Sequence, residues 1–208
     1  MTPGFSANNN NPSAERALEI MAQNNASYIK ESPVAGNGLF AKKAIDTGGL
    51  IFSIPRPLVA ALDTSRLLDT CANCFACNDM IGSSEGLDLK ACTGCNIVKF
   101  CGKACQTDSW KRAHKFECPV FRELERSGRL PNAVRAGMEL LARRKNGRLS
   151  DAQWDELMRL ETHLDDLRAR DDWETHEVLA MGVLKYSKTE GTFDVETAQG
   201  VYARVRTA

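Results

Sequence analysis

Eight cysteines and one histidine gather between Cys71 and Cys118, and these are the side chains best suited to chemistry. Eight of these nine side chains form four pairs: Cys71 and Cys74, Cys92 and Cys95, Cys101 and Cys105, His114 and Cys118. A two-residue gap lets a tight turn direct both sulfurs at one zinc ion, and a three-residue gap puts two ligands one helical turn apart. Four pairs supply two closed four-coordinate sites. The spacing therefore predicts two structural Zn²⁺ ions and no catalytic residue among their ligands.

One cysteine is spare, because two such sites need seven cysteines beside His114 and the chain has eight. Cys74 and Cys77 have the same two-residue spacing as Cys71 and Cys74. Spacing alone therefore leaves open whether Cys71 or Cys77 is the spare thiol.

The composition predicts a globular, intracellular protein. The 208 residues carry 27 basic and 27 acidic side chains, so no global field attracts nucleic acid or an anionic membrane. No apolar run approaches the ~18 residues of a membrane span, and the polar N-terminus has no secretory signal pattern. We expect a nuclear or cytoplasmic location. In such a reducing compartment, clustered cysteines bind metal rather than form disulfides.

The residue pattern of the segments before the cysteines predicts which secondary-structure elements precede the cysteine cluster. We expect a disordered leader and a short helix over residues 1–27, and short strands over residues 28–66. Two apolar runs, 38–45 and 50–54, flank the glycine-containing turn at 46–49. This arrangement predicts a β-hairpin.

Residues 119–208 have the three- and four-residue apolar spacing of amphipathic helices. The expected helices begin near Pro131, Ser150, Asp172 and Asp194. We expect the second of them to run from Trp154 to Leu167, and His163 and His176 to be solvated beside acidic neighbours. The predicted fold class is α+β: an N-terminal hairpin, a two-zinc module at 71–118 and a C-terminal α-helical region.

Residues 71–118 resemble a MYND zinc finger. The resemblance is carried by residues 71–75, 92–95, 100–106, Trp110, 114–115 and 117–118. Phe75 matches the large apolar residue that often follows the second ligand in this family, which favours Cys71 over Cys77. The family's ligand pairs are interleaved and cross-braced. The resemblance thus implies one zinc on Cys71, Cys74, Cys101 and Cys105, and another on Cys92, Cys95, His114 and Cys118.

The segment before the finger resembles the opening strands of a SET methyltransferase domain, through residues 36–41, Ile45, Gly49 and 51–52. A MYND finger placed after such strands is the layout of the SET-and-MYND protein-lysine methyltransferases. The helices after Cys118 are similar to the helical insert of that family. The resemblance implies that Gly36, Asn37 and Gly38 contact S-adenosylmethionine, since glycine permits close backbone approach to a ligand.

The later Asn-His-Ser-Cys segment and the catalytic tyrosine of SET enzymes have no counterpart, since none of the three histidines follows an asparagine. We interpret the chain as the N-terminal part of a SET-and-MYND protein, and we expect it to be inactive alone. The resemblance implies binding of proline-containing peptides in transcriptional or chromatin regulation. The alternative is S-adenosylmethionine-dependent methylation of protein lysines. Nucleic-acid binding by the weakly basic segment 99–129 ranks third, because the net charge is zero.

Overall fold

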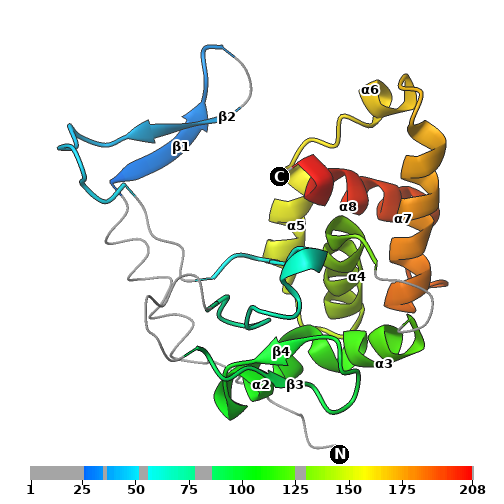
Figure 1. The fold of residues 1–208 in the computed structure, drawn as a ribbon. Helices are drawn as coiled ribbons and strands as arrows, with labels where there is room; N and C mark the ends of the chain where they lie inside the picture. Colours follow the sequence, from blue (N-terminus) through cyan, green and yellow to red (C-terminus); the bar gives the residue numbers. More distant parts are fainter. Residues whose placement is uncertain (1–25, 35–36, 52–55, 78–85, 125–129, 208) are drawn as a thin grey trace, which may run out of the picture. The chain divides into compact units, whose positions relative to one another are not determined.

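The computed structural model describes residues 26–34, 37–51, 56–77, 86–124 and 130–207 (Figure 1). The helix expected within residues 1–25 lies outside these ranges. The chain divides into two compact units, Met1–Pro57 and Leu58–Ala208. Among the described residues, no helix combines the length and the apolar character that crossing a membrane requires.

The first unit contains a two-stranded antiparallel sheet in which β1 (Ser27–Glu31) pairs with β2 (Asn37–Ala41). Tyr28 lies opposite Phe40, and their ring centroids are 5.9 Å apart. The Lys30 ammonium lies 4.4 Å from the centroid of the same Phe40 ring. Cross-strand aromatic pairs of this kind stabilise a register.

The described residues do not form the hairpin predicted around residues 46–49, and residues 52–54 of its second expected strand lie outside the described ranges. The turn itself forms, because the Gly49 amide donates to the Asp46 carbonyl at 2.8 Å. Residues 42–51, however, contain no strand, and the two strands of this unit meet across the earlier turn near Pro33. The segment that follows β2 begins with two lysines and an alanine, which favour strands weakly, whereas the Tyr28–Phe40 pair favours the observed pairing.

The second unit begins at Leu58, passes through a short 3-10 helix η1 (Thr64–Arg66) and enters the cysteine-rich module at Cys71. Two-residue strands β3 (Lys90–Ala91) and β4 (Lys99–Phe100) pair antiparallel. The chain then enters α2 (Lys103–Ser109), passes through a π-helical segment (Trp110–His114) and continues as α3 (Lys115–Leu124). Such π-helical segments change which residues share a helix face, and they are frequent at functional sites.

Five helices follow among the described residues of this unit. They are α4 (Asn132–Lys145), α5 (Asp151–Arg159), α6 (Leu164–Arg168), α7 (Trp173–Ser187) and α8 (Val195–Thr207). Ser150 and Gln153 form the predicted capping box at the start of α5. The single helix expected from Trp154 to Leu167 is wrong, because α5 ends at Arg159 and His163 adopts a left-handed conformation with φ of +52° before α6.

The helical core lies where α4 packs against α7 and α8 (Figure 1). Leu140 and Leu141 of α4 are fully buried in it. Gly137 permits the close approach of α4 to α7, because a Cβ at this position would lie 3.0 Å from the methyl groups of Val183. Met138 faces the other way and joins the small core of the finger, which includes Val98. Helix α4 therefore packs against both parts of the unit.

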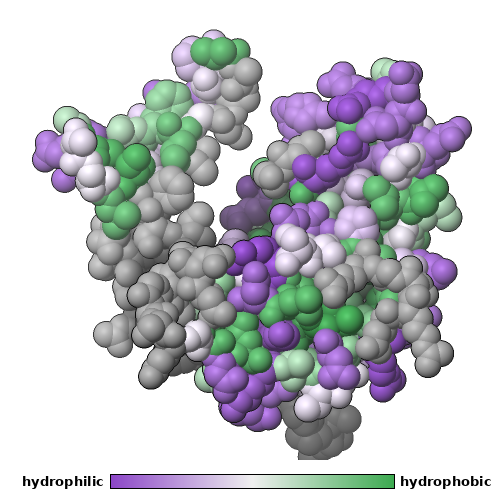
Figure 2. All heavy atoms as spheres, viewed as in Figure 1, coloured by the Kyte–Doolittle hydropathy of each residue, from purple (hydrophilic) through white to green (hydrophobic). Residues whose placement is uncertain are grey.

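The expectation of a solvated His176 is also wrong. Its side chain is 1% exposed, stacked on Trp173 at 5.1 Å and met edge-on by Tyr202 at 4.9 Å. The acidic neighbours lie along the chain, but the face of α7 that carries His176 packs against α8. His163, in contrast, is exposed. Helix α7 also carries the exposed apolar residues Val178 and Met181. Figure 2 shows a green patch on the right, where Figure 1 draws α7.

Candidate metal centres

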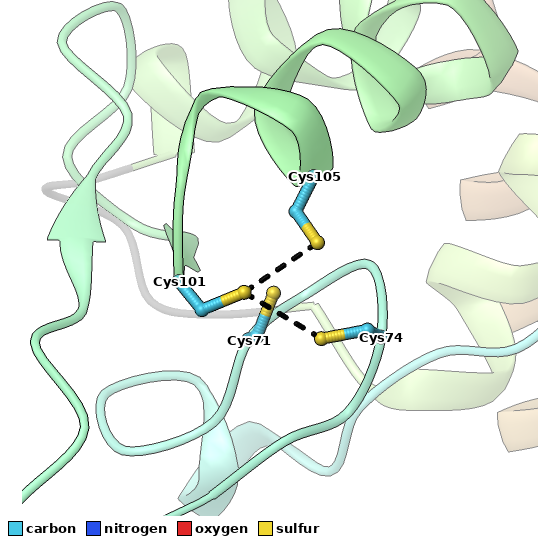
Figure 3. A group of neighbouring side chains, drawn as sticks. All are labelled: Cys71, Cys74, Cys101 and Cys105. Atoms are coloured by element: carbon cyan, nitrogen blue, oxygen red, sulfur yellow. Dashed lines mark hydrogen bonds between the residues drawn. The ribbon is translucent and has the colours of Figure 1, made fainter.

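The first cysteine cluster brings four thiols from three elements to one point (Figure 3). Cys71 and Cys74 bracket a turn, Cys101 follows β4, and Cys105 lies in α2. All four sulfurs lie within 4.8 Å of one another. The Cys101 sulfur is 3.7 Å from that of Cys74 and 3.5 Å from that of Cys105. Tetrahedral Zn–S bonds of about 2.3 Å require sulfurs about 3.8 Å apart, so this cluster fits zinc.

Two hydrogen bonds fix the turn that carries the first pair of this cluster. The Asn73 side-chain amide donates to the Asp108 carboxylate at 3.1 Å, which ties the turn to α2. The Ala72 backbone amide donates to the Lys99 carbonyl at 2.8 Å, which ties it to β4. The elements that carry the other two thiols thus hold this turn in place.

The second cluster consists of Cys92, Cys95, His114 and Cys118, all of them buried. The Cys92 and Cys118 sulfurs are 3.8 Å apart. The Nε2 atom of His114 lies 3.3 Å from the Cys92 sulfur and 3.8 Å from the Cys95 sulfur. A tetrahedral site with Zn–N of about 2.05 Å requires about 3.6 Å between nitrogen and sulfur. The donor set and spacing of this cluster also fit zinc.

Each cluster combines one pair from a turn with a second pair from farther along the chain, and the second cluster's first pair lies between the two pairs of the first cluster, so the two sites are interleaved. This is the grouping that the family resemblance implies. Cys77 belongs to neither cluster. It is buried and lies opposite Thr70 in an isolated β-bridge.

The electrostatics of the second cluster indicate a cation. Burial alone would raise the pKa of the Cys92 thiol, but the contact with His114 and backbone hydrogen bonds lower it to about 6. Burial and the negative charges of Cys95 and Cys92 raise the pKa of Cys118 to about 12. The thiols therefore oppose one another's ionisation. A divalent ion removes this conflict, because it binds all of them as thiolates.

The structure describes two of the three residues expected at S-adenosylmethionine. Gly36 lies outside the described residues, and Asn37 and Gly38 open β2. A Cβ on Gly38 would lie 2.8 Å from the Phe40 ring, so a glycine here makes room for the hairpin's own aromatic side chain. Contact with the cofactor stays a prediction.

Three buried charged residues on α4 were missed at the sequence level: Arg135, Glu139 and Arg143. Their four-residue spacing places them on one helix face, and this repeat of alternating charge was the available signal. The apolar spacing of Val134, Met138 and Leu141 indicated a neighbouring helix face as the buried one.

Comparison with known proteins agrees with the geometry. The MYND finger family model matches residues 71–118. The chain is 28% identical over 112 residues to histone-lysine N-methyltransferase ASHR1 of Arabidopsis thaliana, covering 54% of this chain and 21% of that protein. It is 32% identical over 86 residues to a SET and MYND domain-containing protein of Dictyostelium discoideum, covering 41% and 15%.

A shorter similarity reaches proteins of another class. Over 38 residues the chain is 45% identical to ubiquitin carboxyl-terminal hydrolase 19 of Arabidopsis thaliana, covering 18% of this chain and 6% of that protein. The chain thus spans about a fifth or less of the length of these relatives.

Proposed function

We propose that this chain is the N-terminal part of a SET-and-MYND protein and acts as a zinc-dependent protein-interaction module in transcriptional or chromatin regulation; the MYND finger match at residues 71–118 and the similar SET-and-MYND proteins support this. The observation that carries this proposal is the closure of both metal clusters. Each has four protein ligands, which fill a tetrahedral zinc and leave no position for water or substrate. The zinc ions then hold a surface in place rather than perform chemistry.

An exposed aromatic side chain on the finger supports peptide binding. Trp110 is 46% exposed, and its ring meets the buried His114 ring edge-on at a centroid distance of 5.9 Å. The second zinc site therefore fixes one edge of the indole and leaves part of it open to solvent. Proline-containing segments bind to aromatic surfaces at low entropic cost, because their extended conformation is already formed.

The test is fluorescence polarisation of the zinc-loaded chain with a set of labelled proline-containing peptides. We expect saturable binding that disappears when a chelator removes zinc, and that weakens about tenfold or more in Trp110→Ala, as for an aromatic hot spot. Met181→Ala is the matched control, because Met181 is similarly exposed but lies on α7. Absence of binding, or equal affinity in Trp110→Ala, would contradict the proposal.

Lysine methylation is the second candidate, favoured by the name of the Arabidopsis relative. Isothermal titration with S-adenosylmethionine distinguishes the two functions. An interaction module gives no heat of binding. A methyltransferase gives a saturable signal that Gly36→Arg, at the expected cofactor contact, abolishes.

A further inference from the structure

A stripe of charged side chains is buried on α4, on the side of the helix that faces the finger. Arg135, Glu139 and Arg143 are 6%, 5% and 7% exposed. Burial of a charge is costly unless partners satisfy it.

The two arginines hold the start of the second unit against α4. Arg143 donates to the Glu139 carboxylate at 3.0 Å and to the Leu58 carbonyl at 2.5 Å. Arg135 donates to the Leu62 carbonyl. The backbone over residues 58–62 thus supplies carbonyl acceptors for both guanidinium groups. Glu139 is the acidic residue that lies between the two arginines along α4.

The finger completes the surroundings of Glu139. A cavity of about 30 Å³ is lined by Arg135 and Glu139 from α4 and by Arg112, His114 and Glu117 from the finger. The Nε atom of Arg112 is buried, without a hydrogen-bond partner among the described residues. Burial and the charge of Glu117 raise the pKa of Glu139, and Arg112 and Arg143 oppose this shift. Glu117 and Glu139 therefore line the same small cavity, one from the finger and one from α4.

Glu117 also contacts a zinc ligand. Its carboxylate lies 3.5 Å from Nδ1 of His114, while Nε2 of the same ring faces the Cys92 and Cys95 sulfurs. The His114 side chain is 1% exposed and that of Glu117 is 15% exposed, so little water competes for this contact. A carboxylate on one imidazole nitrogen fixes the tautomer and presents the other nitrogen to the metal.

We propose that Glu117 is a positioning residue for the second zinc site, and that its interaction with Glu139 couples metal binding at this site to the packing of α4 against the finger. The first zinc site has no such connection among the contacts described above. The inference concerns the metal centre and α4, so it stands or falls independently of peptide binding.

The test uses cadmium-113 as the metal probe, because NMR resolves a four-sulfur site from a three-sulfur, one-nitrogen site. In Glu117→Ala we expect the second-site resonance to shift and zinc affinity at that site to fall about 10–100-fold, the usual effect of losing such a partner. The first-site resonance should stay. Glu117→Gln, which can accept the same hydrogen bond, should restore most of the affinity. Glu123→Ala, exposed on the same helix, is the matched control.

The coupling is tested with Glu117→Gln and Glu139→Gln, singly and together, since these changes conserve volume. Their effects on second-site zinc affinity should be non-additive. Should Glu117→Ala fail to fold, the second-site resonance of Glu117→Met, which has a similar length but no carboxylate to accept the hydrogen bond, is compared with that of Glu123→Met. An unshifted resonance, or equal weakening of both sites, would overturn the positioning role. Additive effects would overturn the coupling.

Discussion

Gly94 lies against the zinc ligand Cys118, so closely that a Cβ built on Gly94 would stand 2.7 Å from the Cys118 sulfur. No side chain fits at this distance unless the sulfur moves. We expect Gly94→Ala to displace Cys118 and weaken zinc binding at the second site about tenfold or more, comparable to the loss of an orienting partner. Competition with a chromogenic chelator measures the affinity.

Gly102 provides the control for this substitution. It precedes α2 with an extended backbone, and no atom lies within 4 Å of a Cβ built on it. Gly102→Ala should leave both affinities unchanged. If Gly94→Ala binds two zinc ions as tightly as Gly102→Ala, the close packing around Cys118 does not constrain the site.

Cys77 should be dispensable for metal binding, since it lies in neither cluster whereas Cys71 lies in the first. We expect Cys77→Ser to retain two zinc ions and Cys71→Ser to retain one tightly bound ion. Metal content after dialysis, measured by native mass spectrometry, separates these outcomes. A loss of zinc in Cys77→Ser but not in Cys71→Ser would show that the first pair is Cys74 and Cys77.

The two sites should release zinc in a fixed order. Cys74 is exposed and Cys101 and Cys105 are half-buried, whereas all four ligands of the second site are buried. A chelator or thiol reagent therefore reaches the first site more easily. With limiting chelator and N-ethylmaleimide, peptide mapping should show modification of Cys74 and Cys101 before Cys92. Simultaneous modification would mean that the finger opens as one unit.

The location of the metal ligands was predictable from the sequence, whereas their surroundings were not. Spacing alone paired Cys92 with Cys95, because short turns determine which thiols converge. The resemblance to known fingers supplied the interleaving. The burial of Glu139 was not predicted. It depends on the ion pair with Arg143 and on contact with the finger, which lies on other elements than α4.

Local signals predicted the starts of the helices well wherever a side chain caps the first turn of its own helix. Ser150 and Gln153 cap α5 as expected, and Asp194 accepts a hydrogen bond from the Thr197 amide at the start of α8. The pairing of β1 with β2 was harder to predict. It includes the contact between the rings of Tyr28 and Phe40, which the alternation of apolar residues does not reveal.

His176 should make the stability of the helical region depend on pH. Burial and the charge of Arg206 lower its pKa, and Asp172 and Glu177 oppose this shift; Tyr202 also faces the ring. An unfolded histidine titrates near 6.5, so the unfolded state binds more protons just below that value. Stability should therefore fall as the pH drops below about 6.5. Urea unfolding at pH 7.5 and pH 5.8, with zinc in excess, measures the change.

His176→Phe should reduce this loss of stability at pH 5.8, because a ring that does not titrate replaces the imidazole. His163→Asn is the control, since His163 is exposed and its removal should leave the dependence unchanged. An equal pH dependence in His176→Phe and in the unaltered chain would contradict the assignment.

The central claim is that two zinc ions hold the finger together. Structural zinc supplies about 10–16 kcal/mol in finger peptides at neutral pH, far more than the small core around Val98 and Phe100 offers. The direct measurement is native mass spectrometry of the purified chain during chelation, with the fluorescence of Trp110 in a Trp154→Phe, Trp173→Phe background as the report on the finger. We predict two zinc ions per chain and loss of the folded Trp110 signal as they leave. One zinc ion or none, or a finger that stays folded after complete chelation, would contradict the account.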